Sequence, residues 1–330
     1  MIEKFQACLL GVCIGDALGM PVETMMHEEI QALNGGRGII GFTNPIQSRI
    51  SGTSKLEAGD ATDDWQLTAA VAHSLIQCHG WNKEDCAKEH VKELAKTVSG
   101  WGKTTKRAIA DIRDGKRDLD SLPSDFGPNT GCGNGVIMKI APLALFEVSQ
   151  NGNPSSLLDK CMELGFLTHR DPRASLAAFV VALTICRVIN RPMNSKNDGI
   201  KFYQNTVGYL RRVERKMRIS ANTVSERLER IFNHLNDPDG LRGSVGCGCH
   251  ALETAPFAIG TFLRHPTDFR LGVLEAVNAG GDTDTNGSIV GALIGANCGL
   301  SAIPDCWRSF RPHFAEALDL GRSLYDAAAR

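Results

Sequence analysis

The sequence of 330 residues is poor in aromatic side chains, with only 3 Tyr and 4 Trp, and its formal net charge at pH 7 is only −1. Segments that alternate apolar and polar residues, as half-buried strands do, are scarce. The near-neutral charge excludes a strong general attraction to nucleic acid or to an anionic membrane. No apolar run approaches the ~20 residues of a membrane span. We therefore expect neither a nucleic-acid partner nor a membrane.

Helical periodicity dominates what is present. The ranges that have it are 3–20, 64–79, 83–98, 104–114, 155–166, 174–190, 223–235, 249–264, 270–278 and 286–299. Residues 38–42 could pair locally as a short strand, and 33–60 and 115–135 are the longest irregular stretches. This pattern predicts an all-α fold, organised as a single domain over residues 1–330.

The sequence contains 11 cysteines, but their spacing is irregular and several lie within apolar runs, among them Cys8, Cys13, Cys186 and Cys298. In a chain of this length, buried and reduced thiols of a cytoplasmic protein are the favoured interpretation. The run 7–15 is similar to the core of a signal peptide. A preceding positive excess and a cleavage-like site are both lacking, which argues against that function.

Residues 191–240 are more polar than the rest and include a basic group: Arg211, Arg212, Arg215, Lys216 and Arg218. A nucleic-acid patch is conceivable. Aromatic residues hardly interleave with these charges, so a solvated helical face is favoured.

Glycines recur at every fourth position near the C-terminus, at Gly287, Gly291, Gly295 and Gly299. Each glycine inside a helix costs roughly 1 kcal/mol relative to alanine, so the repeat needs a packing reason. The stripe predicts a central, buried helix that another helix approaches closely.

The segment 280–287 combines paired glycines with Asp282, Asp284 and Thr285 just before that helix. Clustered oxygen ligands on a glycine-rich turn suit a hard divalent cation. An EF-hand loop would require a glutamate where Leu293 stands. A helix cap would explain one carboxylate but not two.

A second acidic cluster, Thr62-Asp63-Asp64, also begins an apolar helix. Each cluster alone could be a helix cap or an independent surface feature. If the two converge, they supply up to four carboxylates and two Thr hydroxyls, enough for two divalent cations.

Two glycine-rich segments could approach a ligand closely, namely 131–135 and the weaker 100–105. Glycine lets backbone N–H groups come near an anion, although a tight turn without ligand is the alternative for 131–135. The first does not follow a strand and the second lacks a P-loop glycine, so neither is a nucleotide-binding motif of those classes.

Four further segments carry chemically informative residues. Asp16 lies in an apolar helix, where it could be a buried, paired acid, and Glu23 follows Pro21 in a loop. His169 alone is more typical of a loop histidine than of a ligand contact. Residues 247–250 look like a zinc motif, but one residue between the cysteines and no second pair favour a turn.

Together these motifs resemble the ADP-ribosylglycohydrolase family, which includes the dinitrogenase-reductase-activating glycohydrolases. The matching segments are 15–23, 62–64, 100–109, 131–145, 168–169, 251–259 and 280–296. The resemblance implies a compact all-α orthogonal bundle. One position departs from the family pattern: Trp65 follows the acidic cluster, where it could reshape the mouth of the pocket or point into the core.

The resemblance also implies a site with two Mg²⁺ or Mn²⁺ ions. Their ligands would be Thr62, Asp63, Asp64, Asp282, Asp284 and Thr285. Glu23 falls where the family places a glutamate on a mobile loop near the metals, and Asp63, Asp64 or Glu23 would be the base. ADP-ribose would bind at Gly131, Gly133, Asn134, Gly135 and His169, with Gly102 and Thr104 in the same cleft.

The implied activity is removal of ADP-ribose from a modified protein, with ADP-ribosyl-arginine as the expected substrate and free ADP-ribose as the product. The protein would act as a monomer, in reversal of a regulatory modification or in immunity to a toxin. Two alternatives stay open: hydrolysis of O-linked or free ADP-ribose derivatives, and a non-catalytic relative that binds ADP-ribose.

Overall fold

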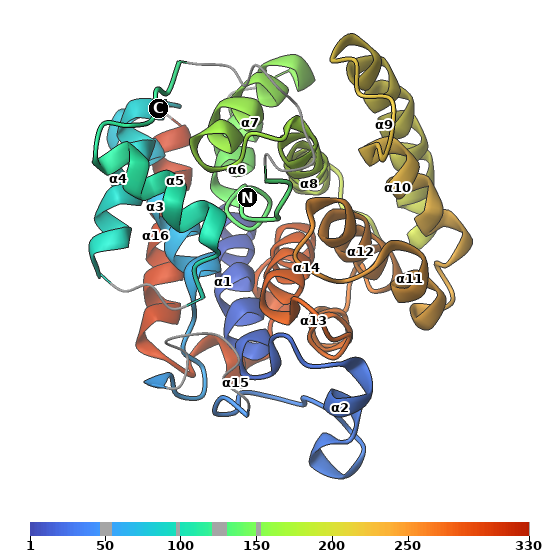
Figure 1. The fold of residues 1–330 in the computed structure, drawn as a ribbon. Helices are drawn as coiled ribbons and strands as arrows, with labels where there is room; N and C mark the ends of the chain where they lie inside the picture. The colour runs from blue at the N-terminus through green and yellow to red at the C-terminus, as the bar shows by residue number, and fades with distance from the viewer. Residues whose placement is uncertain (47–54, 97–99, 121–130, 150–152, 330) are drawn as a thin grey trace.

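The structure, a computed structural model, describes residues 1–46, 55–96, 100–120, 131–149 and 153–329. Within these ranges the chain forms helices and turns without a strand, and one isolated bridge joins Gly133 to His250. The α-helices, labelled in Figure 1, are α1 (Ile2–Gly19), α2 (His27–Gln31), α3 (Asp63–Cys78), α4 (Lys83–Lys96), α5 (Lys103–Arg113), α6 (Ala141–Ser149), α7 (Pro154–Thr168), α8 (Pro172–Asn190), α9 (Lys196–Lys216), α10 (Val224–Arg230), α11 (Pro238–Val245), α12 (Ala251–Arg264), α13 (Phe269–Val277), α14 (Thr283–Cys298), α15 (Asp305–Arg308) and α16 (Pro312–Ala328).

The predicted all-α fold is confirmed, and each of the ten periodic ranges contains a helix. The short strand expected at 38–42 does not form. Instead, the backbone N–H and C=O of Ile39 both bond to the amide side chain of Asn278, at 2.7 and 2.9 Å. This side chain satisfies the backbone groups that a strand partner would otherwise have satisfied.

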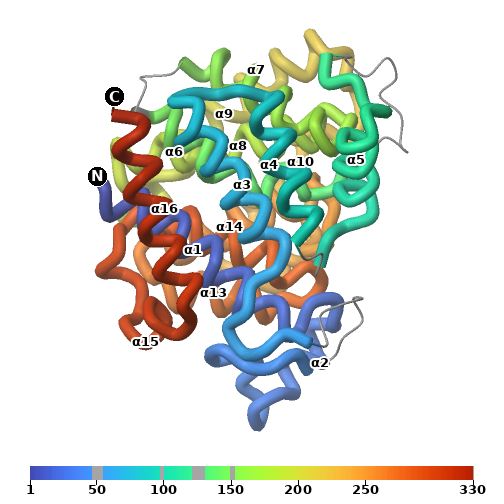
Figure 2. Tube along the Cα trace, turned by 90° about the vertical axis from the view of Figure 1, so that its left-hand side faces the viewer, coloured from blue at the N-terminus to red at the C-terminus, as the bar shows by residue number. Residues whose placement is uncertain are grey.

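Helices α1 and α14 form the centre of the molecule and lie against each other along their length (Figures 1 and 2). The predicted close approach is real, and α1 carries a matching stripe. A Cβ built on Gly11 would lie 2.2 Å from the carbonyl oxygen of Gly291, and one on Gly15 would lie 2.2 Å from that of Gly287. Only glycine pairs permit backbones this close. Gly299 differs from the other members of the stripe, since it caps the end of α14 at φ +80°.

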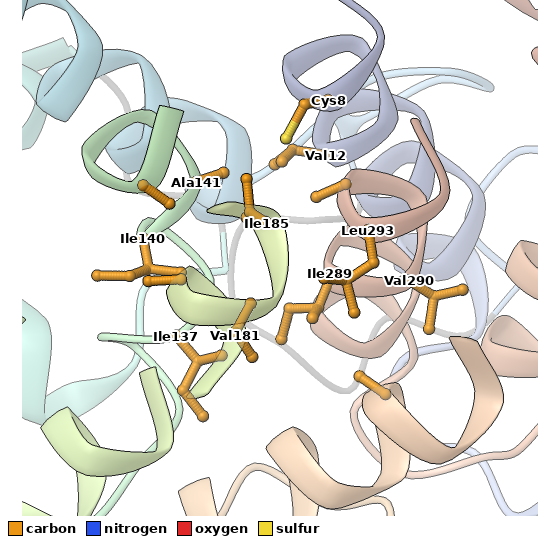
Figure 3. Packing of buried hydrophobic residues seen from close by; sticks show 14 of the residues in the cluster. Cys8, Val12, Ile137, Ile140, Ala141, Val181, Ile185, Ile289, Val290 and Leu293 are labelled. Carbon is orange, nitrogen blue, oxygen red and sulfur yellow. The ribbon is translucent and has the colours of Figure 1, made fainter. Parts of the chain in front are cut away.

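Apolar side chains from helices distant in sequence surround this central pair. Figure 3 shows Val181 and Ile185 of α8 between Ile140 on one side and Ile289 and Leu293 of α14 on the other. In Figure 2, α16 runs beside α1, which brings the C-terminal helix against the N-terminal one. Most buried apolar side chains therefore belong to one cluster, which extends from Phe5 to the last turn of α16. A second, small cluster consists of Leu67, Trp101, Ile109 and Met138.

Within the described ranges, two segments are long and apolar enough to span a membrane by length and composition, Ile2–Val22 and Pro172–Asn190. The expectation that no run approaches this length is therefore wrong. In the structure both are interior helices, with 100% and 78% of their apolar windows buried. Their partners here are α14, α12 and the other core helices, whose contacts account for their composition.

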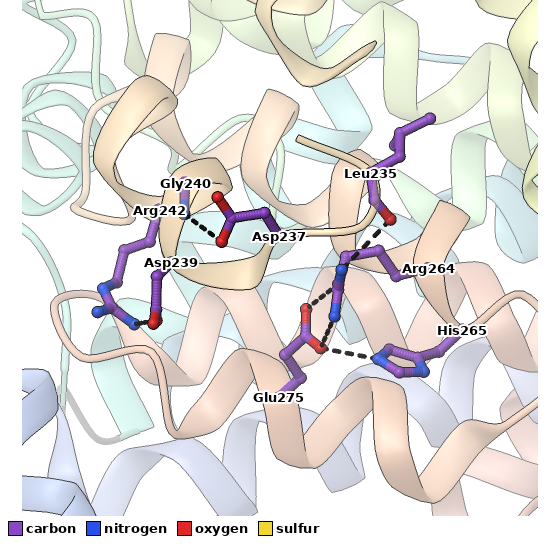
Figure 4. Close-up of polar contacts among 8 residues, drawn as sticks. All are labelled: Leu235, Asp237, Asp239, Gly240, Arg242, Arg264, His265 and Glu275. Atoms are coloured by element: carbon purple, nitrogen blue, oxygen red, sulfur yellow. Dashed lines mark hydrogen bonds and ion pairs between the residues drawn. The ribbon is translucent and has the colours of Figure 1, made fainter. Parts of the chain in front are cut away.

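Helices α9 to α13 form one side of the molecule (Figure 1). The five basic residues of 211–218 are exposed, four of them on α9 and Arg218 just after it, as expected for a solvated helical face. Glu275 of α13 accepts hydrogen bonds from Arg264 Nε at 2.8 Å and from His265 Nε2 at 2.7 Å, which ties α12 to α13 (Figure 4). Asp237 caps α11 through the backbone N–H of Gly240 at 2.9 Å. All 11 cysteines are free thiols.

Candidate active site

The two acidic clusters predicted from the sequence lie together, because the N-termini of α3 and α14 meet. The hydroxyl of Thr285 donates a hydrogen bond to Asp64 Oδ2 at 3.2 Å, across 221 residues of sequence. Asp63, Asp64, Asp284 and Thr285 are buried, with at most 6% of each side chain exposed. Helix N-termini favour negative charge, so both helices stabilise the carboxylates that they carry.

Asp16 of α1 fixes the beginning of α3. Its Oδ2 accepts from the backbone N–H groups of Thr62 and Trp65 at 2.8 and 3.0 Å, while its Oδ1 accepts from the Thr62 hydroxyl at 2.8 Å. Asp16 therefore caps α3 from another helix, and Thr62 makes no cap bond of its own. Burial raises the pKa of Asp16 to about 6, although these three hydrogen bonds oppose the shift.

Glu23 joins the cluster through a loop that is bound to the segment before α14. Thr24 donates its backbone N–H to Gly281 O at 2.8 Å, and Gly281 donates its own to Met25 O at 3.0 Å. Gly281 has φ +72°, and a Cβ there would lie 2.7 Å from the carbonyl oxygen of Cys247, so only glycine suits this position. Carboxylate oxygens of Glu23, Asp282 and Asp284 consequently lie within 4.8 Å of one another.

The crowded carboxylates hold their protons strongly. Burial, then the charge of Asp282, raises the pKa of Glu23 to about 9. Burial, then the charge of Asp16, raises the pKa of Asp63 to about 8. Burial also raises the pKa values of Asp64 and Asp284 well above their usual range. Like charges this close cannot all ionise unless positive charge is supplied.

The donor set fits divalent cations. Glu23 Oε2 and Asp64 Oδ1 are buried and have no hydrogen-bond partner among the described residues. A buried carboxylate oxygen without a partner is costly, and a cation would remove that cost. Carboxylate and hydroxyl oxygens are the ligands that Mg²⁺ and Mn²⁺ prefer. The cluster could therefore hold such ions.

We expect the cation-free protein to lose stability as pH rises from about 4 to about 9. The ordinary pKa of these carboxyls is about 4, whereas in the folded chain those of Glu23 and Asp63 are raised to about 9 and about 8. Between these values the folded state binds more protons than the unfolded state, so the free energy of unfolding falls with pH. Thermal unfolding in EDTA at pH 5, 7 and 9 measures this.

Asp63→Asn is the matched variant, because it removes one of the titrating groups. The melting temperature of this variant in EDTA should therefore fall less steeply with pH than that of the wild type. Adding Mn²⁺ should raise the melting temperature more at pH 8 than at pH 5. A melting temperature in EDTA that is flat or rises over this range would contradict the assignment.

The glycine-rich turn 131–135 wraps around the ring of His169. A Cβ on Gly133 would lie 3.1 Å from His169 Nε2, and one on Gly135 would lie 2.7 Å from its Cε1. On Gly131 a Cβ would lie 3.0 Å from the methyl carbon of Thr104. The glycines therefore make room for these side chains, in addition to any ligand.

Asn134 joins this turn to the acidic cluster. Its side-chain amide donates to Asp282 Oδ2 at 2.9 Å and to Thr254 Oγ1 at 3.0 Å, which accounts for both amide protons. Its backbone N–H donates to Cys249 O at 3.0 Å, and Cys247 O accepts from the backbone N–H of Asp282 at 3.0 Å. Residues 247–250 thus hold the turn and the start of α14 together. Among the described residues they do not form a zinc site.

A cleft of about 380 Å³ joins these parts. Twelve of the fourteen residues predicted for the site line it: Glu23, Asp63, Asp64, Gly102, Thr104, Gly133, Asn134, Gly135, His169, Asp282, Asp284 and Thr285. The other two, Thr62 and Gly131, do not line the cleft, and Thr62 is fully buried.

The other lining residues were not predicted as site residues: Gly100, Trp101, Lys103, Thr105, Met138 and Cys249. Trp101, Lys103 and Thr105 belong to the glycine-rich segment 100–105, so the sequence indicated the segment but not these individual residues. Trp65 does not line this cleft. It lies on a different face of α3, where it lines a separate cavity with His73 and His313.

An all-α core that presents clustered, buried carboxylates to a cleft is the framework of an α-helical hydrolase. The model of the ADP-ribosylglycohydrolase family matches residues 1–330, and the chain belongs to this family, whose members cleave ADP-ribose linkages. The predicted family resemblance is therefore confirmed.

Named relatives agree with this membership. The ADP-ribosylhydrolase ARH3 of Mus musculus is 24% identical over 98% of this chain and 91% of its own. The ADP-ribosyl-[dinitrogen reductase] glycohydrolase of Rhodospirillum rubrum is 25% identical over 93% of this chain and 90% of its own. The solved structure of an ADP-ribosylglycohydrolase-related protein complex covers 99% of this chain and 98% of that chain, with 25% identity and a TM-score of 0.72.

Proposed function

We propose that this protein hydrolyses the N-glycosidic bond between ADP-ribose and an arginine side chain of a modified protein. The observation that supports the proposal most is the convergence of Glu23 with the acidic starts of α3 and α14 at one cleft. The name of the R. rubrum relative, which acts on dinitrogen reductase, is consistent with a protein substrate.

We propose that two Mg²⁺ or Mn²⁺ ions are held by Thr62, Asp63, Asp64, Asp282, Asp284 and Thr285. Ions bound there would supply the positive charge that lets the carboxylates ionise and that orients the hydroxyl groups of the ribose. Thr62 would offer its oxygen lone pairs, since its hydroxyl proton points to Asp16 Oδ1.

The chemistry assigned to the chain itself is proton transfer. Asp63, Asp64 and Glu23 are the candidates to take the proton from the attacking water. The carboxylates that remain ionised would stabilise the oxocarbenium-like sugar that forms as the bond breaks. The turn 131–135 and His169 would bind the diphosphate and its ribose, while Gly102 and Thr104 border the same ligand.

The deciding experiment offers arginine-, serine- and carboxylate-linked ADP-ribosylated proteins to the enzyme and measures free ADP-ribose, with Mg²⁺ or with EDTA. We expect release from the arginine-linked substrate with Mg²⁺ and none with EDTA. Faster release from a serine- or carboxylate-linked substrate would instead establish the O-linked alternative. Binding of ADP-ribose without release from any substrate would establish the non-catalytic one.

Asp284→Ala should lower the rate of release by at least about 100-fold, because it removes a carboxylate that lies within 4.8 Å of two others. Glu28→Ala is the matched control: its carboxylate is exposed on α2 and lies outside the cleft, so its rate should match that of the wild type. Release by Asp284→Ala at the wild-type rate would overturn the cation assignment, whereas the hydrolase assignment would stand.

We further propose that the protein acts as a monomer in the cytoplasm, where it would reverse a regulatory ADP-ribosylation or confer immunity to an ADP-ribosylating toxin.

A further inference from the structure

Lys139 is a fully buried lysine that the proposed chemistry does not use. It lies between the glycine-rich turn and α6, with 0% of its side chain exposed. Its ammonium donates to the hydroxyl oxygen of Thr168 at 3.2 Å, and no salt bridge joins it to a carboxylate among the described residues. A buried lysine without such a partner is energetically costly, so the hydrogen bond that it makes within the described part of the chain needs a reason.

That hydrogen bond limits what the Thr168 hydroxyl can do next. An ammonium group has donors only, so Thr168 accepts from Lys139 with one lone pair, which leaves its hydroxyl with one proton and one further lone pair. Among the described residues, His169 Nδ1, at 2.9 Å, is the one other hydrogen-bond neighbour of this hydroxyl, so the buried hydroxyl proton is satisfied only when it is donated to Nδ1. In that arrangement the ring proton of a neutral His169 is on Nε2.

The surroundings also keep His169 neutral. Burial, followed by the positive charges of Lys139 and Arg117, lowers the pKa of His169 to about 3. Burial lowers the pKa of Lys139 to about 8, and the charge of Asp63 acts in the opposite direction, so Lys139 is mostly an ammonium at neutral pH. The charge pattern and the hydrogen-bond pattern therefore select the same state of the ring.

The nitrogen opposite Nδ1 lies beside the glycine-rich turn that borders the cleft, 3.1 Å from where a Cβ on Gly133 would be. His169 lines the cleft, and its Nε2 has no partner among the described residues. The bare Cα atoms of Gly133 and Gly135 leave the space that the ring occupies. A ligand oxygen that enters beside this turn would meet an N–H donor in a buried setting, where such a bond is stronger than in water.

We propose that Lys139 and Thr168 are positioning residues that hold His169 as the neutral Nε2–H tautomer, so that it donates a hydrogen bond to an oxygen of the bound ligand. The identity of that ligand, ADP-ribose through a phosphate or ribose oxygen, rests on the proposed function. The tautomer itself does not, because it is set by the chain alone. The opposite tautomer would present a lone pair that repels the same oxygen.

The test is ¹⁵N NMR of histidine-labelled protein in EDTA without ligand, with His169 assigned by its loss in His169→Gln. We expect one neutral Nε2–H tautomer of His169 from pH 5 to pH 7, where Lys139 is an ammonium. An Nδ1–H tautomer, or a ring that is protonated at pH 6, would overturn the proposal. This readout requires no catalysis, so a protein that fails to hydrolyse ADP-ribosyl-arginine but shows Nε2–H would overturn the proposed function alone.

Two variants test whether Lys139 and Thr168 set the tautomer of His169. Lys139→Met keeps the buried volume but frees the Thr168 hydroxyl to turn, so the Nδ1–H tautomer should appear and the affinity for ADP-ribose should fall at least threefold. Thr168→Ser keeps the hydroxyl and should retain the wild-type tautomer and affinity. Calorimetry measures the affinity, and thermal unfolding checks that both variants fold. A wild-type tautomer and affinity in Lys139→Met would overturn the role of the lysine.

Discussion

Gly291→Ala is expected to lower the free energy of unfolding by about 3 kcal/mol or more, because the added methyl group would overlap the backbone of α1. Its Cβ would lie 2.2 Å from the carbonyl oxygen of Gly11, which belongs to the backbone of α1. A flexible side chain could move aside, but a helix backbone cannot do so without separating α1 from α14. Urea denaturation in EDTA measures the loss without any contribution from bound cations.

The matched control is Gly208→Ala, on the peripheral helix α9. A Cβ at Gly208 would have nothing within 4 Å, and its backbone is helical. Because alanine is a better helix former than glycine, this variant should be unchanged or more stable by up to about 1 kcal/mol. If Gly291→Ala were as stable as Gly208→Ala, the close approach of the two central helices would be wrong.

Asp16→Asn is expected to weaken cation binding by about 10- to 100-fold, although Asp16 is not itself a proposed ligand. The Asp16 carboxylate accepts three hydrogen bonds, two from backbone N–H groups of α3 and one from the Thr62 hydroxyl. An asparagine has one oxygen fewer to accept them, and its NH₂ group would face a donor. Thr62 and Asp63 would then lose their fixed orientation. Titration calorimetry with Mn²⁺ measures the affinity.

Asp237→Asn provides the control for this variant. Asp237 also caps a helix (Figure 4), but it is not among the residues that line the cleft. Asparagine caps helices about as well as aspartate, so cation affinity and stability should stay close to the wild type. Equal Mn²⁺ affinities of Asp16→Asn and the wild type would show that the capping of α3 by Asp16 does not control the site.

Helical periodicity predicted ten of the helices, and the glycine stripe predicted that α14 is central. Helices α2, α6, α9, α11, α15 and α16 lie outside the predicted ranges. Helix α6 is almost wholly apolar and so has no periodic pattern, whereas α9 lies in the polar segment 191–240, for which a solvated helical face was predicted without helix bounds. Helix α16 was missed as well; its Gly321 looks like an interruption but is the point where α16 meets the backbone of Gln6. The reason for a glycine at this position becomes clear only when the helix that packs against it is known.

The residues of the acidic cluster could be predicted from the sequence, because carboxylates next to glycines at a helix start are unusual. The sequence also indicated Asp16 as a buried, paired acid, but not its partner, and it did not indicate Lys139. These two residues act through contacts with segments 46 and 29 residues away in sequence. The glycines 131–135 suggested a ligand, whereas in the structure they also accommodate the ring of His169. Their second role depends on a contact that only the fold creates.

The pairing of α1 with α14 also constrains how the chain can fold as it leaves the ribosome. The Ser288 hydroxyl bonds to Val12 O across 276 residues, and Thr283 bonds to Gly19 O across 264. The first helix is synthesised with a long apolar run, and most of the chain must be made before its partner α14 exists. Contacts of such high sequence separation form slowly, and apolar surface exposed meanwhile is prone to aggregation. We therefore expect chains truncated before α14 to be bound by chaperones or degraded rather than to form a smaller folded unit.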